Sequence, residues 1–288
     1  MVAKKKSSLK SLQAGRPPTA RSGRSMSRKA SRTLINTHHQ LEKRRRQAAA
    51  TGDDKAEAAI AAEIASLGGL GHYQQASLQG QSLDRGGDTS KVLLEWLSTK
   101  EVATGGPRLK MLEVGALSTR NACSRSGLFD MVHIDLNSQE QGILEQDFME
   151  RPLPASDTDK FDIISLSLVL NFVPEAEGRG QMLLRTLSFL REQKAASQGP
   201  FPFPALFLVL PRSCLDNSRY MTQSRLEELM GDLCYQRVHI KMTQKLAYSL
   251  WHNTRLLPST KIEFTKREVN PGRTRNNFVI TLQHRANQ

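Results

Sequence analysis

The chain contains little of what marks secreted, membrane or zinc-binding proteins. Its 288 residues include three cysteines, an odd number without CxxC or CxH spacing, which argues against a disulfide framework and against a zinc site. The longest wholly apolar run covers residues 205–210, far below the ~20 residues that span a bilayer, and no apolar segment follows the first lysines as in a secretory signal. We therefore expect a soluble, reduced, intracellular protein without a membrane span.

Several catalytic signatures are also missing. The nucleophile elbow GxSxG, the zinc motif HExxH and the P-loop do not occur, and the seven histidines show no paired spacing near acids, so we expect no bound metal. The dinucleotide fingerprint GxGxxG is incomplete, because Gly115 is followed by Ala116, Leu117 and Ser118. A ligand without a pyrophosphate therefore fits this chain better than NAD or FAD.

Negative charge is scarce at the N-terminus. Residues 1–50 carry 14 lysines and arginines against one acid, Glu42, and no aromatic residue, whereas residues 51–288 carry 27 bases and 27 acids. Such a segment cannot bury enough apolar surface to offset the entropy of ordering, so we predict a disordered basic tail over residues 1–50. Nuclear or nucleolar import, contact with RNA phosphates and simple solubility all fit this composition, and the charge density favours the first two.

The remainder, residues 51–288, is predicted to form one α/β domain. Residues 51–104 make a helical lead-in, with apolar residues at helical spacing in 53–67 and 91–102. Beyond it strands alternate with helices, which predicts a doubly wound, Rossmann-like domain with a mostly parallel sheet and an antiparallel pair at one edge. The expected strands are 110–114, 131–134, 143–146, 162–170, 206–210, 237–250 and 277–282, and the expected helices are 121–126, 175–193 and 222–233.

Three of these strands end in residues suited to an adenosine ligand. Gly115 lets a ligand approach the backbone, and Asp135 ends the second strand twenty residues later, where a carboxylate accepts hydrogen bonds from ribose hydroxyls. Asp147 and Phe148 follow the third strand, where a carboxylate can accept from an adenine amino group and an aromatic ring can cover the base. A turn glycine, a helix cap and a surface acid are the ordinary alternatives, and the joint occurrence favours the ligand.

Five longer strings carry a more specific resemblance. They are LEVGALSTRNACS (112–124), VHIDLNS (132–138), QDFMERPLP (146–154), FDIISLSLVLNFVP (161–174) and LVLPRSCLDNSRYM (208–221). In these strings the chain resembles the fungal 25S ribosomal RNA adenine-N1 methyltransferases, nucleolar enzymes that depend on S-adenosylmethionine (SAM), and the resemblance extends over residues 71–282.

The resemblance implies a SAM-dependent methyltransferase domain that methylates N1 of an adenine in large-subunit rRNA or a pre-ribosomal particle, in the nucleolus. It implies Gly115 near the methionine portion of SAM and Asp135 on the ribose. Glu113, Asp147 and Phe148 are further contacts expected from SAM-dependent methyltransferases generally. Only the first glycine of the usual GxGxG remains, so the path of the following loop departs from the common pattern.

Residues after the fourth and fifth strands are candidates for holding the target base. N1 of neutral adenine carries an in-plane lone pair, so methylation there needs alignment rather than a general base. Asn171 is the candidate for the adenine edge and Phe172 for stacking, with a helix cap and a core position as the alternatives. Two interpretations are equally favoured for the residues after the fifth strand: they contact the target nucleotide, or they form an ordinary loop. These residues are Asn217, Ser218, Arg219 and Tyr220.

The C-terminal part is basic and offers a surface for RNA. From Arg237 to the end there are ten lysines and arginines against two acids. Trp251 and Tyr248 lie among them and fit either base stacking or packing in the core. With the N-terminal tail, this stretch is expected to contact RNA phosphates.

Two rival functions belong to other classes. A SAM-binding regulatory protein that senses the cofactor and lacks methyltransferase activity would keep the same Gly115 and Asp135. An NAD-linked oxidoreductase would need the missing phosphate glycines. The basic tail favours the RNA enzyme, because a cytosolic sensor has no need of it.

Overall fold

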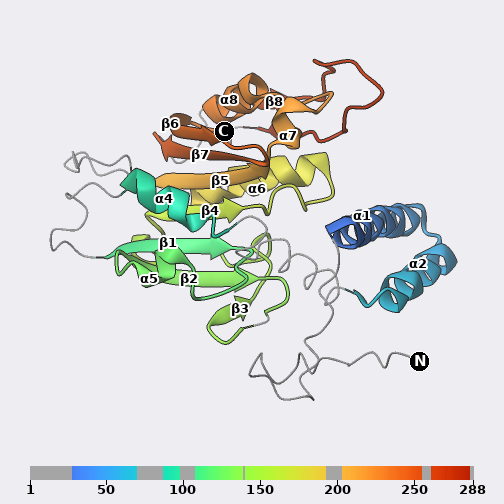
Figure 1. Cartoon of the computed structure of the whole chain (residues 1–288), viewed down its shortest axis with the longest axis horizontal. Coiled ribbons are helices and arrows are strands. Elements are labelled where there is room, and N and C mark those ends of the chain that lie inside the picture. Colours follow the sequence, from blue (N-terminus) through green and yellow to red (C-terminus); the bar gives the residue numbers. More distant parts are fainter. Residues whose placement is uncertain are drawn as a thin grey trace, which may run out of the picture.

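A seven-stranded sheet forms the centre of the folded domain. The computed structural model describes residues 28–69, 87–97, 108–138, 140–192, 203–254 and 261–285. The strands of the sheet lie in the order β3-β2-β1-β4-β5-β7-β6 (Figure 1). They are β1 Leu109–Val114, β2 Phe129–Asp135, β3 Ile143–Glu145, β4 Ile163–Ser167, β5 Ala205–Pro211, β6 Tyr235–Met242 and β7 Leu246–Asn253. Strands β1 to β5 are parallel, and β7 pairs antiparallel with both β5 and β6. The predicted mostly parallel sheet with an antiparallel edge is confirmed.

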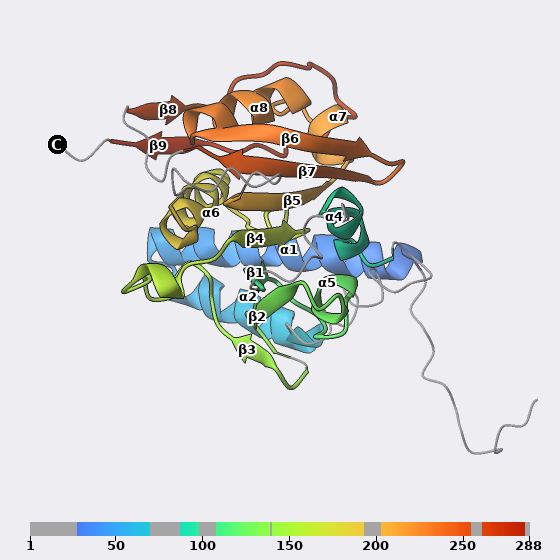
Figure 2. The same cartoon turned by 90° about the vertical axis from the view of Figure 1, so that its left-hand side faces the viewer.

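Helices cover both faces of this sheet (Figures 1 and 2). Helices α4 (Ser90–Leu97) and α5 (Ala122–Arg125) pack on one face, and α6 (Ala176–Phe189) and α8 (Gln223–Asp232) pack on the other. Successive side chains of a strand point to opposite faces of the sheet, and in β5 both faces are apolar. Leu206 and Leu208 pack in the core with α6. Phe207 and Val209 pack in the core with α4. Two short turns of helix, η1 (Asp157–Asp159) and α7 (Ser213–Asp216), lie in the connections.

The last strands differ from the predicted ones. The stretch 237–250 divides into β6 and β7 at a turn that the hydrogen bond from Thr243 N to Leu246 O closes at 2.8 Å. These two strands therefore supply the antiparallel edge. Most of the predicted strand 277–282 is irregular, and β9 (Leu282–His284) pairs instead with β8 (Ile262–Phe264) in a separate two-stranded sheet. Strand β4 ends at Ser167 rather than at residue 170, because Leu168 takes a positive φ of 60°.

The prediction of a disordered segment over residues 1–50 is wrong from Arg28 onward. Helix α1 (Arg28–Thr51) pairs with α2 (Asp54–Ser66) across a turn at Gly52, whose φ is +71°. Leu41 and Ala48 of α1 are buried against Ile60 and Ile64 of α2. The charge of the segment obscured a seven-residue apolar spacing, which places these two side chains on one helix face. Residues 1–27 lie outside the described residues.

The α1–α2 pair lies beyond the edge at which the parallel strands end. The arrowheads of β1 and β4 point toward α1 in Figure 1, and in Figure 2, where β1 is seen nearly end-on, α1 and α2 lie behind it. In the part of the chain that the structure describes, no helix is long and apolar enough to cross a bilayer.

Candidate cofactor and substrate site

The turn after β1 has no room for a side chain. Gly115 has a φ of +73°, and a Cβ built on it would lie 2.6 Å from Cγ2 of Val169, in the loop after β4. The N–H groups of Gly115 and Ala116 donate to the carbonyl of Ile134 at 2.8 and 3.0 Å, which binds the turn to the end of β2. Backbone conformation and space thus both require glycine, and the turn lies where the ends of β1, β2 and β4 meet.

Asp135 is the last residue of β2, beside this turn. Its Oδ1 accepts from the N–H of Asn137 at 2.9 Å and its carbonyl accepts from Gln146 N at 2.8 Å, so it forms a turn rather than a helix cap. Burial raises the pKa of the carboxyl, the Asn137 hydrogen bond opposes this, and Glu145 adds to the rise. The neighbouring Leu136 is 60% exposed, an unusual position for a large apolar side chain. Sequence reasoning missed Leu136, although it directly follows the predicted ribose acid.

Phe148 is not available to cover a base. Its side chain is 2% exposed, its ring centroid lies 5.3 Å from that of Phe189 in α6, and its carbonyl accepts from Arg185 Nε at 2.9 Å. The ring therefore packs against α6 in the core, not over the strand ends where it was expected. Asp147 remains half-buried at the strand end, with Oδ1 accepting from the N–H of Met149 at 2.7 Å.

Glu113 is part of a buried polar cluster. Its Oε2 accepts from Asn121 Nδ2 at 2.7 Å and lies 3.4 Å from His133 Nε2, which in turn lies 3.0 Å from Ser124 Oγ. Burial raises the pKa of Glu113 to about 7, the Asn121 hydrogen bond opposes the rise, and Asp88 adds to it. Burial likewise lowers the pKa of His133. The Glu113 carboxyl therefore fixes the loop between Gly115 and α5, a role that sequence spacing did not suggest.

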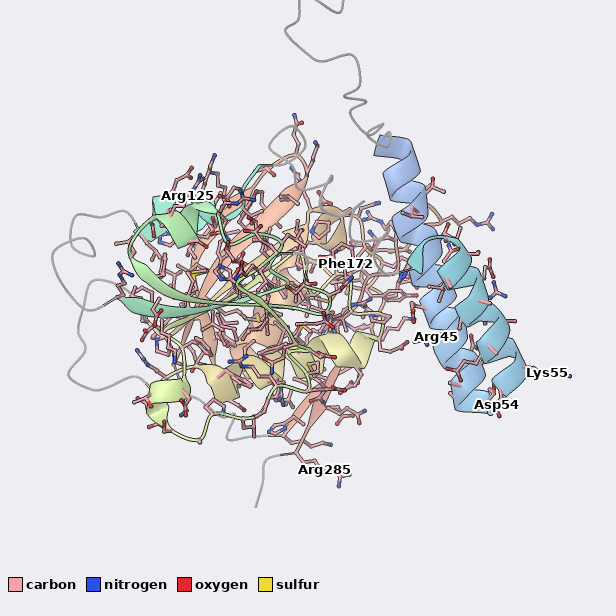
Figure 3. The ribbon with its side chains drawn as sticks, turned by 90° about the horizontal axis from the view of Figure 1, so that it is seen from below. Arg45, Asp54, Lys55, Arg125, Phe172 and Arg285 are labelled. Carbon is pink, nitrogen blue, oxygen red and sulfur yellow. The ribbon has the colours of Figure 1, made fainter. Side chains whose placement is uncertain are left out.

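The loop after β4 brings Asn171 to the same edge. Helix α6 begins at Ala176 with Glu175 as its N-cap, so Asn171 does not cap it. Its Oδ1 is one of two buried side-chain polar atoms without a hydrogen-bond partner among the described residues, a state that costs about 1–3 kcal/mol. Phe172 is half-buried and lies on the side of the domain that faces α1 and α2 (Figure 3).

The predicted group after β5 divides into structural and exposed residues. Ser218 is fully buried, and its Oγ donates to Phe278 O at 2.6 Å and accepts from the N–H of Tyr220 at 3.0 Å, so it is a structural residue. Asn217 is exposed, and Arg219 Nε donates to Gly272 O at 3.0 Å. These contacts attach the loop after β5 to the C-terminal segment.

That C-terminal segment presents basic side chains. Residues 266–275 hold four bases and one acid, and Lys266, Arg267 and Arg273 are exposed. Trp251 and Tyr248, by contrast, are 2% and 5% exposed, so both belong to the core and neither can stack on a base. Within the described residues, no group of three His, Cys, Asp or Glu side chains is placed to hold a metal ion.

Comparison with known proteins identifies the family. The profile of the Bmt2 family, described as 25S rRNA (adenine(2142)-N(1))-methyltransferase, matches residues 58–280. The protein of that name from Saccharomyces cerevisiae is 42% identical over 222 residues, which cover 76% of this chain and 62% of the relative. The 25S rRNA adenine-N(1) methyltransferase of Schizosaccharomyces pombe is 36% identical over 259 residues, 88% of this chain and 91% of the relative.

Among solved structures, the magnesium protoporphyrin IX methyltransferase of Synechocystis with bound SAM is similar over 58% of this chain and 78% of its own, at 13% identity and a TM-score of 0.42. The chain spans less than two thirds of the length of the S. cerevisiae relative and most of the S. pombe one. The matched region 58–280 contains the Gly115 turn, Asp135 and the Asn171 loop, and the chain belongs to the Bmt2 family.

Proposed function

We propose that this chain is a SAM-dependent methyltransferase that methylates N1 of an adenine in large-subunit rRNA. Membership of the Bmt2 family supports the reaction and the substrate. The observation that carries the proposal is the turn at Gly115, where no side chain fits, beside the half-buried carboxyl of Asp135. This is the arrangement that an adenosine ligand requires at the ends of parallel strands.

The residues at this edge fit SAM. The missing Cβ of Gly115 allows a ligand to approach the backbone, and a carboxylate has about four lone-pair sites, so Asp135 can accept from ribose hydroxyls besides the Asn137 amide. Leu136, rather than Phe148, offers the apolar cover for the adenine ring. When bound, SAM supplies an electrophilic methyl group on a sulfonium sulfur.

The protein's remaining work is to hold the target base. N1 of neutral adenine attacks with its ring-plane lone pair, so no side chain has to remove a proton. The base must be unpaired and aligned with the methyl group, and alignment of this kind accounts for much of the rate of such reactions. The loop containing Asn171 packs on the Gly115 turn through Val169, which supports this role for the loop.

We infer that the basic C-terminal segment contacts the rRNA or pre-ribosomal particle. The exposed side chains of Lys266, Arg267 and Arg273 would neutralise phosphates without reading sequence. Arg219 and Asn270 hold this segment against the loop after β5 through hydrogen bonds of 3.0 and 3.1 Å, so its charges stay near the substrate edge of the sheet.

The test is primer extension across large-subunit rRNA, because a methyl group on N1 blocks base pairing and stops reverse transcriptase. We expect one stop that disappears in cells lacking the gene and returns with the wild type but not with Gly115→Arg. Gly231→Arg is the matched control, because a Cβ on Gly231 meets nothing within 4 Å. An unchanged stop pattern in the deletion strain, with SAM binding still measurable, would contradict the enzyme and favour the regulatory protein.

We also propose that the protein accumulates in the nucleolus. Residues 1–27 carry seven lysines and arginines and no acid, and a cut after residue 27 leaves α1 whole. A fluorescent fusion of the full chain should concentrate in nucleoli, and removal of residues 1–27 should reduce this while SAM affinity stays unchanged. A cytoplasmic full-length fusion would contradict the proposal.

A further inference from the structure

The loop after β4 is held firmly on both sides. On one side, Val169 packs where a side chain on Gly115 would lie. On the other, Arg179 of α6 donates to Val173 O at 2.9 Å, to Pro174 O at 3.3 Å and, across the domain, to Val279 O at 2.6 Å. The segment between these anchors contains Asn171, so the backbone that carries this side chain is held on both sides.

A buried amide oxygen without a protein partner is costly, and in native proteins such groups are satisfied by an ordered water, an ion or a ligand or belong to a functional site. Asn171 Oδ1 has no partner among the described residues, and Asn171 plays no part in capping α6. The other such atom, Arg225 Nε, belongs to a guanidinium whose NH1 and NH2 groups reach Glu228 and the carbonyl of Thr265. Asn171 is therefore the unsatisfied group in the loop that packs on the Gly115 turn, two residues after Val169.

We propose that Asn171 recognises the target adenine, with Oδ1 accepting a hydrogen bond from the exocyclic N6 amino group. This inference rests on the proposed adenine methylation. An amide oxygen is an acceptor, and adenine presents an amino group beside N1, whereas guanine presents a carbonyl oxygen there. The same contact therefore orients N1 and excludes guanine, because two acceptors would face each other.

The contact also strengthens during the reaction. N1 forms the new bond to the methyl carbon with its lone pair, while the electrons of the breaking C–S bond stay on sulfur. Positive charge thus moves from sulfur into the N1–C6–N6 unit of the base, and no proton is transferred in this step. The N6 hydrogens become better donors as the charge develops, so an acceptor held at Asn171 stabilises the transition state more than the bound substrate.

The experiment pairs a protein change with a substrate change. Single-turnover methylation would be measured for the wild-type full chain and for Asn171→Ala on two RNA fragments. One fragment contains the mapped target adenine. The other has purine, which lacks the amino group, at that position. Loss of the amino group also lowers the nucleophilicity of N1 and slows methylation by both proteins. The quantity compared between the two RNAs is therefore the ratio of the wild-type rate to the variant rate. The expected ratio is roughly 10 to 100 on adenine and near 1 on purine.

Two further variants make the result specific. Asn171→Asp keeps an acceptor oxygen and should retain most of the rate, and the exposed Asn277→Ala should behave as the wild type. SAM affinity should be unchanged in all three variants. Equal ratios on both RNAs, or an Asn171→Asp variant as slow as Asn171→Ala, would overturn the role of Asn171 while leaving methylation intact. Absence of methylation by the wild type would instead contradict the proposed function.

Discussion

The contact between the Gly115 turn and Val169 predicts a measurable steric coupling. Replacing Gly115 by alanine forces a residue with a Cβ into a φ of +73°, which costs about 1–2 kcal/mol. The new Cβ would also lie 2.6 Å from Val169 Cγ2, and overpacking of this kind costs about 1–3 kcal/mol. Gly115→Ala should therefore lower the free energy of unfolding by about 2–5 kcal/mol, a large part of the stability of an ordinary domain.

Val169→Ala removes the atom that collides but leaves the backbone strain. In a double-mutant cycle, Gly115→Ala should thus cost about 1–3 kcal/mol less in a chain that already carries Val169→Ala than in the wild type. Urea unfolding followed by circular dichroism measures all four proteins, and Gly231→Ala in open space serves as the control without a clash. An equal cost of Gly115→Ala in both backgrounds would refute the steric account of this turn.

Three further predictions concern other parts of the chain. Gly180→Ala should destabilise the domain by about 1–3 kcal/mol in urea unfolding, because its Cβ would overlap the carbonyl oxygen of Thr281, and an unchanged midpoint would exclude this close approach. Burial raises the pKa of Glu113 from 4.5 to about 7, so the folded state keeps a proton that the unfolded state releases, and stability should fall as the pH rises between these values. Glu113→Gln should remove this fall, and a fall that persists would show that another group causes it. Leu41→Asp should reduce helical circular dichroism by separating α1 from α2 while SAM affinity is retained, since Leu41 is 3% exposed in their contact, and unchanged helicity would contradict that contact.

The position of Gly115 and Asp135 at neighbouring strand ends was predictable from the sequence. Gly115 follows and Asp135 ends a short segment that the alternation of strands and helices identifies as a strand, and neighbouring parallel strands end at the same edge of the sheet. The direction of individual side chains was less predictable. Phe148 was expected beside the ligand and is buried in the core, whereas Leu136, for which the sequence suggested no role, is 60% exposed.

The α1–α2 pair shows a different limit. Composition averages over a segment, and the average of residues 1–50 is dominated by positive charge. Helix pairing depends instead on a few positions, and Leu41 and Ala48 are the buried positions of α1 that pack against α2. The partner helix lies outside the segment, so no property of the segment alone could have predicted the pairing.

A carboxyl with a pKa of about 7 at a catalytic edge often indicates acid-base chemistry, and Glu113 has that property. Its contacts indicate a structural role instead, because Oε2 accepts a hydrogen bond from Asn121 and lies close to His133 Nε2. Methylation of N1 requires no proton transfer, so the proposed reaction leaves Glu113 without a catalytic task. The raised pKa is then a consequence of burying a carboxyl to hold the loop, and under the proposed function we expect the chemistry to take place where the Gly115 turn meets the loop that contains Val169 and Asn171.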